Sequence, residues 1–437
     1  MPYGKPAATL YGDHLIMSRK KVLIIGAGAA GLAAADRLLE SGKECCIVEA
    51  TGRAGGRIQH LDGFAPWPIE LGAEEVHGLD TCLRRLVEDS GADFITHESR
   101  DDIVRLDGQM SSLSVAADDP DMQRAFDFIS GLDRVEKPDW TAEQSLVFSQ
   151  FPRRTRHYLD SRLGVEHGTT LNRLGLRGFK TYEKGWEARE NNYTINRPYL
   201  SLFARMLERA QGILRLNAPV ESLRWGAAHP SVSLIGGEVL EADQVIITSS
   251  VAVLKSGLPA FDPPLPPEKL EAISNIGMDT GMKILLRFSE RFWPEEMYFL
   301  HTDGFLPQFC TPGKWRDPEC HVLTAFIGGS RAEFLANLGC DPIAFAVAEL
   351  DEAFGGKIAS RLFKKGHVAD WGKEPFVRGL YSYPMATTTE AHREALAAPL
   401  ANKIYFAGEA TDLHGHTGTV HGAIESGWRA AEEILNS

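Results

Sequence analysis

The first clear pattern is the run Lys21–Ile25, which is apolar and rich in β-branched residues after its first position. A short continuous run of this kind predicts a strand that is buried on both faces. A glycine-rich turn follows, and Ala29–Glu40 then has a helical pattern that ends at Ser41–Gly42, a typical C-terminal cap. A second apolar run, Cys45–Val48, predicts the next strand. This order of strand, helix and strand predicts an α/β fold.

The turn between strand and helix has three glycines at the spacing of a phosphate-binding loop. Gly26 permits the tight turn, Gly28 lets backbone N–H groups approach a pyrophosphate, and Gly31 lets the helix pack close to the sheet. The N-terminal end of the helix then faces the phosphates. Glu49 follows the second strand, where a carboxylate accepts hydrogen bonds from ribose hydroxyls and disfavours a 2′-phosphate. We therefore expect a Rossmann-like dinucleotide site made by Gly26, Gly28, Ala30, Gly31, Glu49 and Ala50.

A segment rich in glycine and arginine, Gly52–Ile58, comes directly after the second strand. Alone, it is typical either of a flexible basic loop or of backbone donors and guanidinium groups near a pyrophosphate. Together with Gly26–Gly31, Glu49, Glu70–Ala73 and Tyr405–Ala431, it resembles the flavin-containing amine oxidase family. That family includes monoamine oxidases, polyamine oxidases and lysine-specific histone demethylases. The resemblance spans almost the whole chain, with motifs at both ends in the expected order.

The resemblance implies FAD, held by residues from both ends of the chain. Gly408 and Glu409 would reach the pyrophosphate and ribityl chain, and the backbone of Val220 would contact the adenine. A helix beginning at Thr419 would direct its positive end at the flavin. No cysteine lies near Thr419, so we expect non-covalent binding. The other expected cofactor contacts are Arg53, Gly56, Arg57, Gly72, Ala73, Glu74, Trp371 and Val420.

The chain returns to the first domain in its middle. Residues 199–207 have a helical pattern, residues 213–220 and 242–248 have strand patterns, and a short hairpin lies between the two strands. The predicted fold is α/β, with a Rossmann-like FAD-binding domain of the GR2 type and a discontinuous, mixed α+β substrate-binding domain. We assign 18–80, 199–252 and 386–437 to the FAD-binding domain, 81–198 and 253–385 to the substrate-binding domain, and 1–17 to a flexible extension, with Met17 as an alternative start to Met1.

Lys283 is the first residue to which the resemblance assigns chemistry. It lies in the strand-like run Gly281–Phe288, on the same face as Leu285 and Arg287. A lysine in a strand is typically a solvated surface residue. The family pattern instead implies that it holds a water against flavin N5 and assists reoxidation by O2.

The segment Trp371–Tyr383 resembles the family segment that places an aromatic ring beside the flavin. Tyr381 would form one side of the substrate cage, with Trp371 and Phe376 lining the site, although aromatic residues also cluster in ordinary cores. In monoamine oxidases the opposite wall is a second tyrosine. Here that position is Thr419, as in polyamine oxidases and demethylases.

The segment Gly72–Gly78 places His77 where animal-type polyamine oxidases have a histidine facing the substrate, although a loop histidine is more often a surface residue. Glu74 and Glu75 are candidates for binding a distal ammonium group, and we expect one of them to be structural. Amino-acid oxidases usually have an arginine in this segment to bind the substrate carboxylate. None is present here, which favours amines over amino acids.

Composition is consistent with a soluble enzyme. A chain of 437 residues with 43% hydrophobic content can form two domains. The net charge of −13 argues against a nucleic-acid partner and suits either a cationic substrate or solubility alone. No signal peptide, membrane-spanning run or peroxisomal address is evident, so we expect a cytoplasmic protein without membrane contact. The six cysteines lack metal-ligand spacing, so we expect no metal and a reducing compartment.

The reaction that the resemblance implies is hydride transfer from the α-carbon of a neutral amine to flavin N5. Hydrolysis of the imine gives an aldehyde and an amine, and O2 is reduced to H2O2. We expect a polyamine oxidase that takes a small amine and O2 and is a monomer or homodimer. The alternatives are a monoamine or L-amino acid oxidase, a histone-demethylase-like protein and a non-catalytic flavoprotein. The family pattern is lost at 182–189 and Asn196–Tyr199, which leaves one pocket wall undefined. The expected catalytic residues are Lys283, Tyr381, His77 and Thr419.

Overall fold

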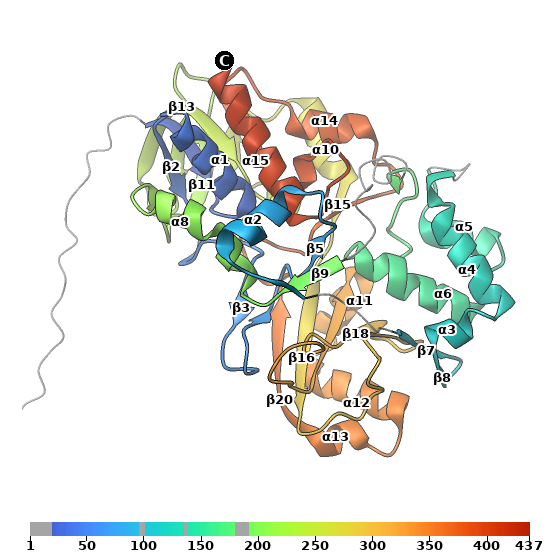
Figure 1. The fold of residues 1–437 in the computed structure, drawn as a ribbon. Helices are drawn as coiled ribbons and strands as arrows, with labels where there is room; N and C mark the ends of the chain where they lie inside the picture. The colour runs from blue at the N-terminus through green and yellow to red at the C-terminus, as the bar shows by residue number, and fades with distance from the viewer. Residues whose placement is uncertain (1–19, 96–100, 135–138, 180–191) are drawn as a thin grey trace, which may run out of the picture.

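The computed structural model describes residues 20–95, 101–134, 139–179 and 192–437 (Figure 1). The predictions made for 1–17 and 182–189 lie outside these residues. Two large sheets dominate the described structure, one in the upper half and one in the lower half of the view in Figure 1.

The first sheet has eight strands: β1 (Lys20–Ile25), β2 (Cys45–Val48), β10 (Leu214–Arg215), β11 (Val220–Arg224), β12 (Ser231–Leu234), β13 (Val239–Ile247), β14 (Ala260–Asp262) and β22 (Ile404–Phe406). Its central strands are parallel, since β1 pairs with β2 and β13, and β13 pairs with β22. The two apolar runs near the N-terminus are therefore neighbouring buried strands, as predicted, because both of their faces are covered by helices.

Helices cover the first sheet on both faces. On one face, α1 (Ala29–Glu40) and α15 (Val420–Leu435) lie side by side, one from each end of the chain (Figure 1). A Cβ added at Gly427 of α15 would lie 2.2 Å from the carbonyl oxygen of Ala30, so the two helices are in close backbone contact. The same core includes η3 (Tyr199–Phe203), α8 (Ala204–Ala210) and α2 (Cys82–Ser90). The opposite face is covered by α9 (Val251–Lys255), α10 (Pro267–Asn275) and α14 (Glu390–Ala397).

The second sheet has seven strands: β7 (Ile103–Leu106), β8 (Gln109–Ser112), β16 (Gly281–Phe288), β17 (Phe299–His301), β18 (Gln308–Cys310), β19 (Val322–Gly328) and β20 (Phe363–Asp370). The alternation in β16 is as predicted. Met282, Ile284 and Leu286 pack in the core that contains α11 (Gly329–Asn337), α12 (Pro342–Phe354) and α13 (Ile358–Leu362). Lys283 and Leu285 face the other way, toward residues 61–74 and Trp371.

A helical region lies beside the second sheet, on the right of Figure 1. It consists of α3 (Leu113–Ala116), α4 (Pro120–Ser130), η1 (Leu132–Arg134), α5 (Ala142–Phe148), α6 (Arg153–Leu159) and the π-helical turn η2 (Asp160–Gly164). The remaining elements are β3 (His60–Leu61) with β4 (Ile69–Glu70), β5 (Val76–His77) with β9 (Asn192–Ile195) and β6 (Phe94–Ile95), β15 (Ile276–Met278) with β21 (Ser382–Pro384), and η4 (Glu409–Thr411).

Two contacts bear on the predicted domain boundaries. Strand β14 pairs with β11 of the first sheet, although the boundary at residue 252 would place it in the other domain. Helix α2 packs in the core of the first sheet through Leu83 and Val87, although the boundary at residue 80 excludes it. The domain division stays a prediction, and these contacts would shift its boundaries.

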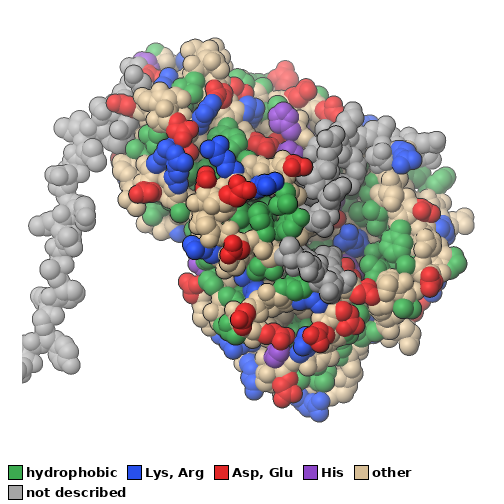
Figure 2. Space-filling model, in the orientation of Figure 1, with side chains coloured by type: hydrophobic (Ala, Val, Ile, Leu, Met, Phe, Trp, Pro, Cys, Tyr) green, Lys and Arg blue, Asp and Glu red, His purple; other side chains and the backbone are tan. Residues whose placement is uncertain are grey.

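The described surface carries both signs of charge. On the face shown in Figure 2, acidic and basic side chains are interspersed, so the net charge of −13 does not form a single acidic patch there. Within the described ranges, no helix is both long enough and apolar enough to cross a membrane.

Candidate active site

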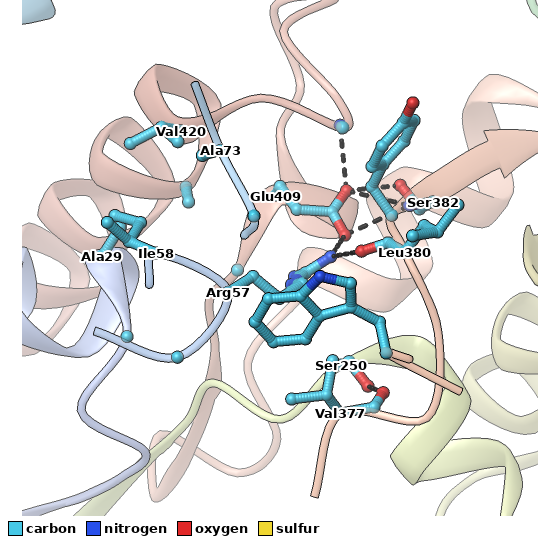
Figure 3. A pocket seen from close by; sticks show the side chains of 18 of the residues that line it. Ala29, Arg57, Ile58, Ala73, Ser250, Val377, Leu380, Ser382, Glu409 and Val420 are labelled. Carbon is cyan, nitrogen blue, oxygen red and sulfur yellow. Dashed lines mark hydrogen bonds and ion pairs between the residues drawn. The ribbon is translucent and has the colours of Figure 1, made fainter. Parts of the chain in front are cut away.

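A cavity of about 520 Å³ is lined by residues of both sheets and of both ends of the chain (Figure 3). This volume is typical of a cofactor or ligand site. The predicted site residues that line it are Gly26, Gly28, Ala30, Glu49, Ala50, Arg53, Gly56, Arg57, Gly72, Ala73, Glu74, His77, Val220, Lys283, Trp371, Tyr381, Gly408, Glu409, Thr419 and Val420. Residues separated by almost the whole chain therefore meet at one cavity.

Gly31 is the exception, because it does not line the cavity. Its contact with the cofactor stays a prediction. A Cβ at this position would lie 2.0 Å from the carbonyl oxygen of Gly26, which is impossibly close. Gly31 thus allows α1 to pack against the turn that precedes it.

The first turn of α1 has the donors that a pyrophosphate requires. Gly28 is the N-cap of the helix and makes no side-chain cap, and the first turn has no acidic residue, so the free N–H groups are not occupied by a side chain. A Cβ at Gly28 would have no atom within 4 Å, which places open space beside the turn. These features fit the phosphates of FAD.

Glu49 is buried at the end of β2. Its Oε2 accepts from the backbone N–H of Ala27 at 2.8 Å, and its Oε1 accepts from the backbone and hydroxyl of Thr51 at 2.9 and 2.8 Å. A carboxylate offers about four acceptor positions. Glu49 is thus fixed by the protein and retains capacity for a hydroxyl donor of the kind that a ribose provides.

Alanine substitutions at Gly28 and Gly31 form a matched pair of predictions. Gly28→Ala should fold normally but bind FAD at least about tenfold more weakly, because the added methyl group enters space beside the phosphate site. Gly31→Ala should destabilise the protein by about 2 kcal/mol or more, because the methyl group overlaps backbone. Thermal unfolding of the FAD-free protein and fluorescence titration with FAD measure the two effects. Equal FAD affinity for wild type and Gly28→Ala would contradict the proposed phosphate site.

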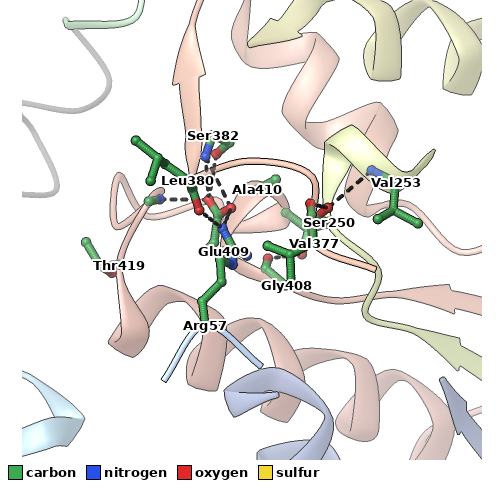
Figure 4. Close-up of polar contacts among 12 residues, drawn as sticks. Arg57, Ser250, Val253, Val377, Leu380, Ser382, Gly408, Glu409, Ala410 and Thr419 are labelled. Carbon is green, nitrogen blue, oxygen red and sulfur yellow. Dashed lines mark hydrogen bonds and ion pairs between the residues drawn. The ribbon is translucent and has the colours of Figure 1, made fainter. Parts of the chain in front are cut away.

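The buried carboxylate of Glu409 accepts hydrogen bonds from three other segments around the cavity (Figure 4). Glu409 accepts from Arg57 Nη1 at 2.9 Å, from the Ser382 hydroxyl at 2.6 Å and from the backbone N–H of Gly418 at 2.9 Å. The same Nη1 of Arg57 donates to the carbonyl of Leu380 at 2.7 Å. Burial would raise the pKa of Glu409, but Arg57 and Ser382 outweigh it and lower the pKa below its usual range. The side chains of Glu409 and Arg57 are thus engaged with each other, and their contact with FAD stays a prediction.

Lys283 forms an ion pair inside the cavity. Its Nζ donates to Glu74 Oε2 at 2.8 Å and to the backbone oxygen of Glu70 at 3.4 Å. Burial would lower the pKa of Lys283, but Glu74 outweighs this effect and raises it. Lys283 is therefore a fixed cation. Of Glu74 and Glu75, it is Glu74 that forms the ion pair with Lys283.

Cys310 lines the same part of the cavity. Burial raises the pKa of its thiol, with Glu74 adding to the effect, so Cys310 stays protonated. A protonated thiol is a poor nucleophile, which agrees with the prediction that FAD is held non-covalently.

Glu70 is a buried carboxyl group beside this ion pair. One oxygen accepts from the backbone N–H of Tyr199 at 2.7 Å, and the other has no hydrogen-bond partner among the described residues. Burial, with Glu74 nearby, raises the pKa of Glu70 to about 8. Glu70 thus holds a proton at neutral pH, because an unpaired buried charge is costly.

This shift predicts a pH dependence of stability. Between the unfolded value of 4.5 and the folded value of about 8, the folded protein binds a proton that the unfolded chain releases. The free energy of unfolding should therefore fall as pH rises through this window, by up to about 4 kcal/mol. Glu70→Gln should remove most of that slope, whereas Glu88→Gln, at an exposed position, should retain it. Urea unfolding at a series of pH values measures both, and equal slopes in wild type and Glu70→Gln would contradict the assignment.

The aromatic residues are fixed by their polar atoms. Trp371 Nε1 donates to the backbone oxygen of Leu71 at 2.9 Å, and the Tyr381 hydroxyl donates to the backbone oxygens of Val165 and Glu166 at 3.1 and 3.0 Å. Phe376 also lines the cavity. These rings therefore present apolar surface to the cavity with their orientation already set.

Thr419 is the N-cap of helix α15, which starts at this point of the chain as predicted. Its hydroxyl accepts from the backbone N–H of Gly422 at 3.0 Å and donates to the carbonyl of His416 at 2.7 Å. The preceding loop contacts the aromatic wall, since a Cβ at Gly418 would lie 3.4 Å from the Tyr381 ring. The first turn of α15 lines the cavity through Val420 and Ala423. The role of Thr419 as a substrate wall stays a prediction.

His77 lies at the end of β5, where its Nδ1 is 2.9 Å from Asn192 Oδ1. The centroid of its ring lies 6.3 Å from that of the His421 ring, in an edge-to-face arrangement. The motif predicted His77 as a site residue. It did not predict His421, which lies in α15 at a position like those of the core residues of this helix. Burial, with His416 and His77 nearby, lowers the pKa of His421 to about 3, so His421 is neutral.

Sequence reasoning also missed charged groups at the cavity. Arg162 and Glu166 line it from η2 and the residues after it, and Glu374 lines it beside Trp371. No motif marks these residues, and only the packing of the helical region against the second sheet brings Arg162 to the site.

Three residues that the sequence did not predict as site residues form a cluster: Asp412, His416 and Glu425. Their potential metal-ligand atoms lie within 4.8 Å of one another. His416 Nδ1 is 2.8 Å from Glu425 Oε2, and Asp412 Oδ1 accepts from the backbone N–H groups of His414 and His416. The group is held together by these bonds, and we assign no metal to it.

Comparisons with known proteins agree with this geometry. The family model described as flavin containing amine oxidoreductase matches residues 29–179 and 118–435. Mouse lysine-specific histone demethylase 1B is 26% identical over 465 residues, which cover 97% of this chain and 54% of that protein. Human peroxisomal N(1)-acetyl-spermine/spermidine oxidase is 27% identical over 505 residues, which cover 95% of each chain. The chain thus spans about half the length of the demethylase.

Two solved structures show the same fold. Putrescine oxidase bound to putrescine has a TM-score of 0.82 at 19% identity, covering 96% of this chain and all of that one. Cyclohexylamine oxidase from Brevibacterium oxydans has a TM-score of 0.82 at 21% identity, covering 96% of this chain and 99% of that one. These likenesses confirm the predicted fold class.

Proposed function

This chain belongs to the family of flavin containing amine oxidoreductases, and we propose that it is an oxidase of small amines, with polyamines as the expected class. Its cofactor is FAD. When bound, FAD supplies the redox chemistry, by accepting a hydride from the amine and passing the electrons to O2. The observation that carries the proposal is the meeting, in one cavity, of the N-terminal glycine turn, Lys283 and the aromatic wall.

The protein residues would bind, orient and stabilise. Lys283 keeps a positive charge in a buried setting, where it stabilises negative charge far better than in water. Trp371 and Tyr381 would exclude water and guide the substrate between fixed aromatic surfaces. The N-terminal end of α15 would stabilise negative charge on the reduced cofactor.

The acidic residues of the cavity support a cationic substrate. Glu75 lines the cavity and accepts from Asn192 Nδ2 at 3.0 Å and from the Tyr298 hydroxyl at 3.4 Å. Glu166 lines it as well and has an exposed side chain. Either carboxylate suits an ammonium group distant from the oxidised carbon. Cytoplasmic location and the H2O2 product remain part of the proposal.

Other members of the family motivate the alternatives. The likeness to histone demethylase 1B favours methylated lysine as a second candidate, and oxidation of monoamines or amino acids is a third. All three classes are oxidised at a carbon next to nitrogen. Their members differ in the rest of the molecule, so a panel with members of each class separates them.

The test is peroxide detection with purified, FAD-loaded protein and O2. The panel contains putrescine, spermidine, spermine, N(1)-acetylspermine, phenylethylamine, ornithine, lysine and a dimethyl-lysine peptide. We expect turnover of at least one polyamine. Turnover of phenylethylamine without any polyamine would overturn the polyamine class, and peroxide with none of these compounds would count against the oxidase itself.

A further inference from the structure

Arg162 places a positive charge at the cavity, which binding of a plain, cationic polyamine does not require. Arg162 lies in η2, which continues α6, and lines the cavity with Val165 and Glu166. In Figure 1, α6 lies beside the second sheet, and its helix reaches the centre of the molecule near β9. The π-helical geometry of η2 is frequent at functional sites.

The guanidinium of Arg162 is not engaged by the described protein. No hydrogen bond or ion pair joins its side chain to any described residue. The other two arginines of the cavity are engaged, Arg53 with Gln59 at 2.8 Å and Arg57 with Glu409 at 2.9 Å. A guanidinium has five N–H donors in a planar fork that matches a carboxylate.

Two of the carboxylates near Arg162 accept hydrogen bonds from other groups. Asp102 Oδ1 accepts from the backbone N–H of Phe299 at 3.1 Å, and Glu75 accepts from Asn192 and Tyr298. Burial would lower the pKa of Arg162, but Glu166 and these carboxylates outweigh it and raise the pKa. Arg162 is thus a charged, largely desolvated donor group that lines the cavity and has no hydrogen-bond acceptor among the described residues. Such a group is costly unless a ligand supplies an acceptor.

We propose that the substrate carries a carboxylate as well as the oxidised amine, and that Arg162 binds this carboxylate. Glu166 and Glu75 line the same cavity and suit an accompanying ammonium group. The substrate class is then an amino acid, or a diamine with an amino-acid end. This inference rests on the proposed amine oxidase activity and changes its expected substrate class from plain polyamines to amines that carry a carboxylate. The lack of an arginine in Gly72–Gly78 favoured amines over amino acids. In this proposal, Arg162 supplies the arginine from a different segment.

Matched substrates isolate the carboxylate. Ornithine is putrescine with a carboxylate on one end carbon, and lysine stands in the same relation to cadaverine. Anaerobic stopped-flow measurement of flavin bleaching in the FAD-loaded protein gives the half-saturating concentration of each. We expect it to be at least about tenfold lower for ornithine or lysine than for the matching diamine.

Variants at Arg162 provide the second part of the test. Arg162→Gln should raise the half-saturating concentration for ornithine about 30-fold or more and change that for putrescine by less than about threefold. Arg162→Lys keeps the charge but loses the fork, and should lie between wild type and Arg162→Gln. Arg153→Gln, an exposed substitution on the preceding helix and outside the cavity, is the control.

Two results would overturn the inference. One is a wild-type protein that prefers putrescine to ornithine and cadaverine to lysine, which needs no variant. The other is an Arg162→Gln variant that weakens both members of each pair equally. If no amine bleaches the flavin, the proposed oxidase activity fails. Calorimetric binding of ornithine and putrescine to the wild type then decides the carboxylate inference separately.

Discussion

Lys283→Met is expected to slow the reoxidation of the reduced flavin by O2 about 100-fold or more, while FAD content stays unchanged. Lys283 is 8% exposed and is held as a cation by Glu74. Reduction of O2 builds negative charge, which a fixed cation in a water-poor site stabilises. Methionine keeps the length and most of the volume of the side chain without the charge. Stopped-flow mixing of the reduced protein with O2 measures the rate directly.

The ion pair of Lys283 with Glu74 requires a control for stability. Lys283→Met leaves Glu74 buried without its cation, so some loss of stability is expected. The double variant with Lys283→Met and Glu74→Gln removes that charge and should recover stability without recovering the reoxidation rate. Lys364→Met, at an exposed position of the adjacent strand β20, should change neither. Reoxidation at the wild-type rate in Lys283→Met would exclude the assigned role.

Glu409→Gln is expected to lower the free energy of unfolding by about 3 to 5 kcal/mol and to yield protein with little bound FAD. Glu409 is 4% exposed, and its oxygens accept from Arg57, Ser382 and Gly418. Glutamine has one acceptor oxygen, and its NH2 group would face donors (Figure 4). Arg57 would then lose its charged partner at the cavity wall.

The same substitution on a surface ion pair is the matched control. Glu432 on α15 pairs with Arg37 of α1, and both side chains are more than 40% exposed. Glu432→Gln should cost less than about 1 kcal/mol. Denaturant unfolding at neutral pH and the flavin absorbance of purified protein give the two readouts. Equal effects of the two substitutions would contradict the structural role of Glu409.

Local patterns predicted the elements that we expect to hold the cofactor. The helix Ala29–Glu40 has the predicted bounds, and so does the strand Cys45–Val48. Both are specified by continuous patterns and by residues at their ends, which short-range physics determines. The helix that begins after Thr419 is likewise marked by its N-terminal cap.

The details of the substrate side depend on long-range packing. The pairing of Lys283 with Glu74 joins residues 209 positions apart. The sequence predicted that one of Glu74 and Glu75 is structural, but it did not show which one or its partner. Spacing alone does not separate a glycine that contacts the cofactor from one that lets the helix pack closely, and Gly31 is closely packed and does not line the cavity. Arg162 lies in a helical region with no motif, so its place at the cavity emerges only from the packed structure.

Anaerobic mixing of the FAD-loaded protein with small amines tests the amine oxidase assignment most directly. The panel includes putrescine, spermidine, ornithine and lysine, and the readout is the visible absorbance of the flavin. We expect at least one amine to bleach the flavin completely, with a rate that saturates with amine concentration, and admission of O2 to restore the colour. A flavin that keeps its colour with every amine would contradict the assignment.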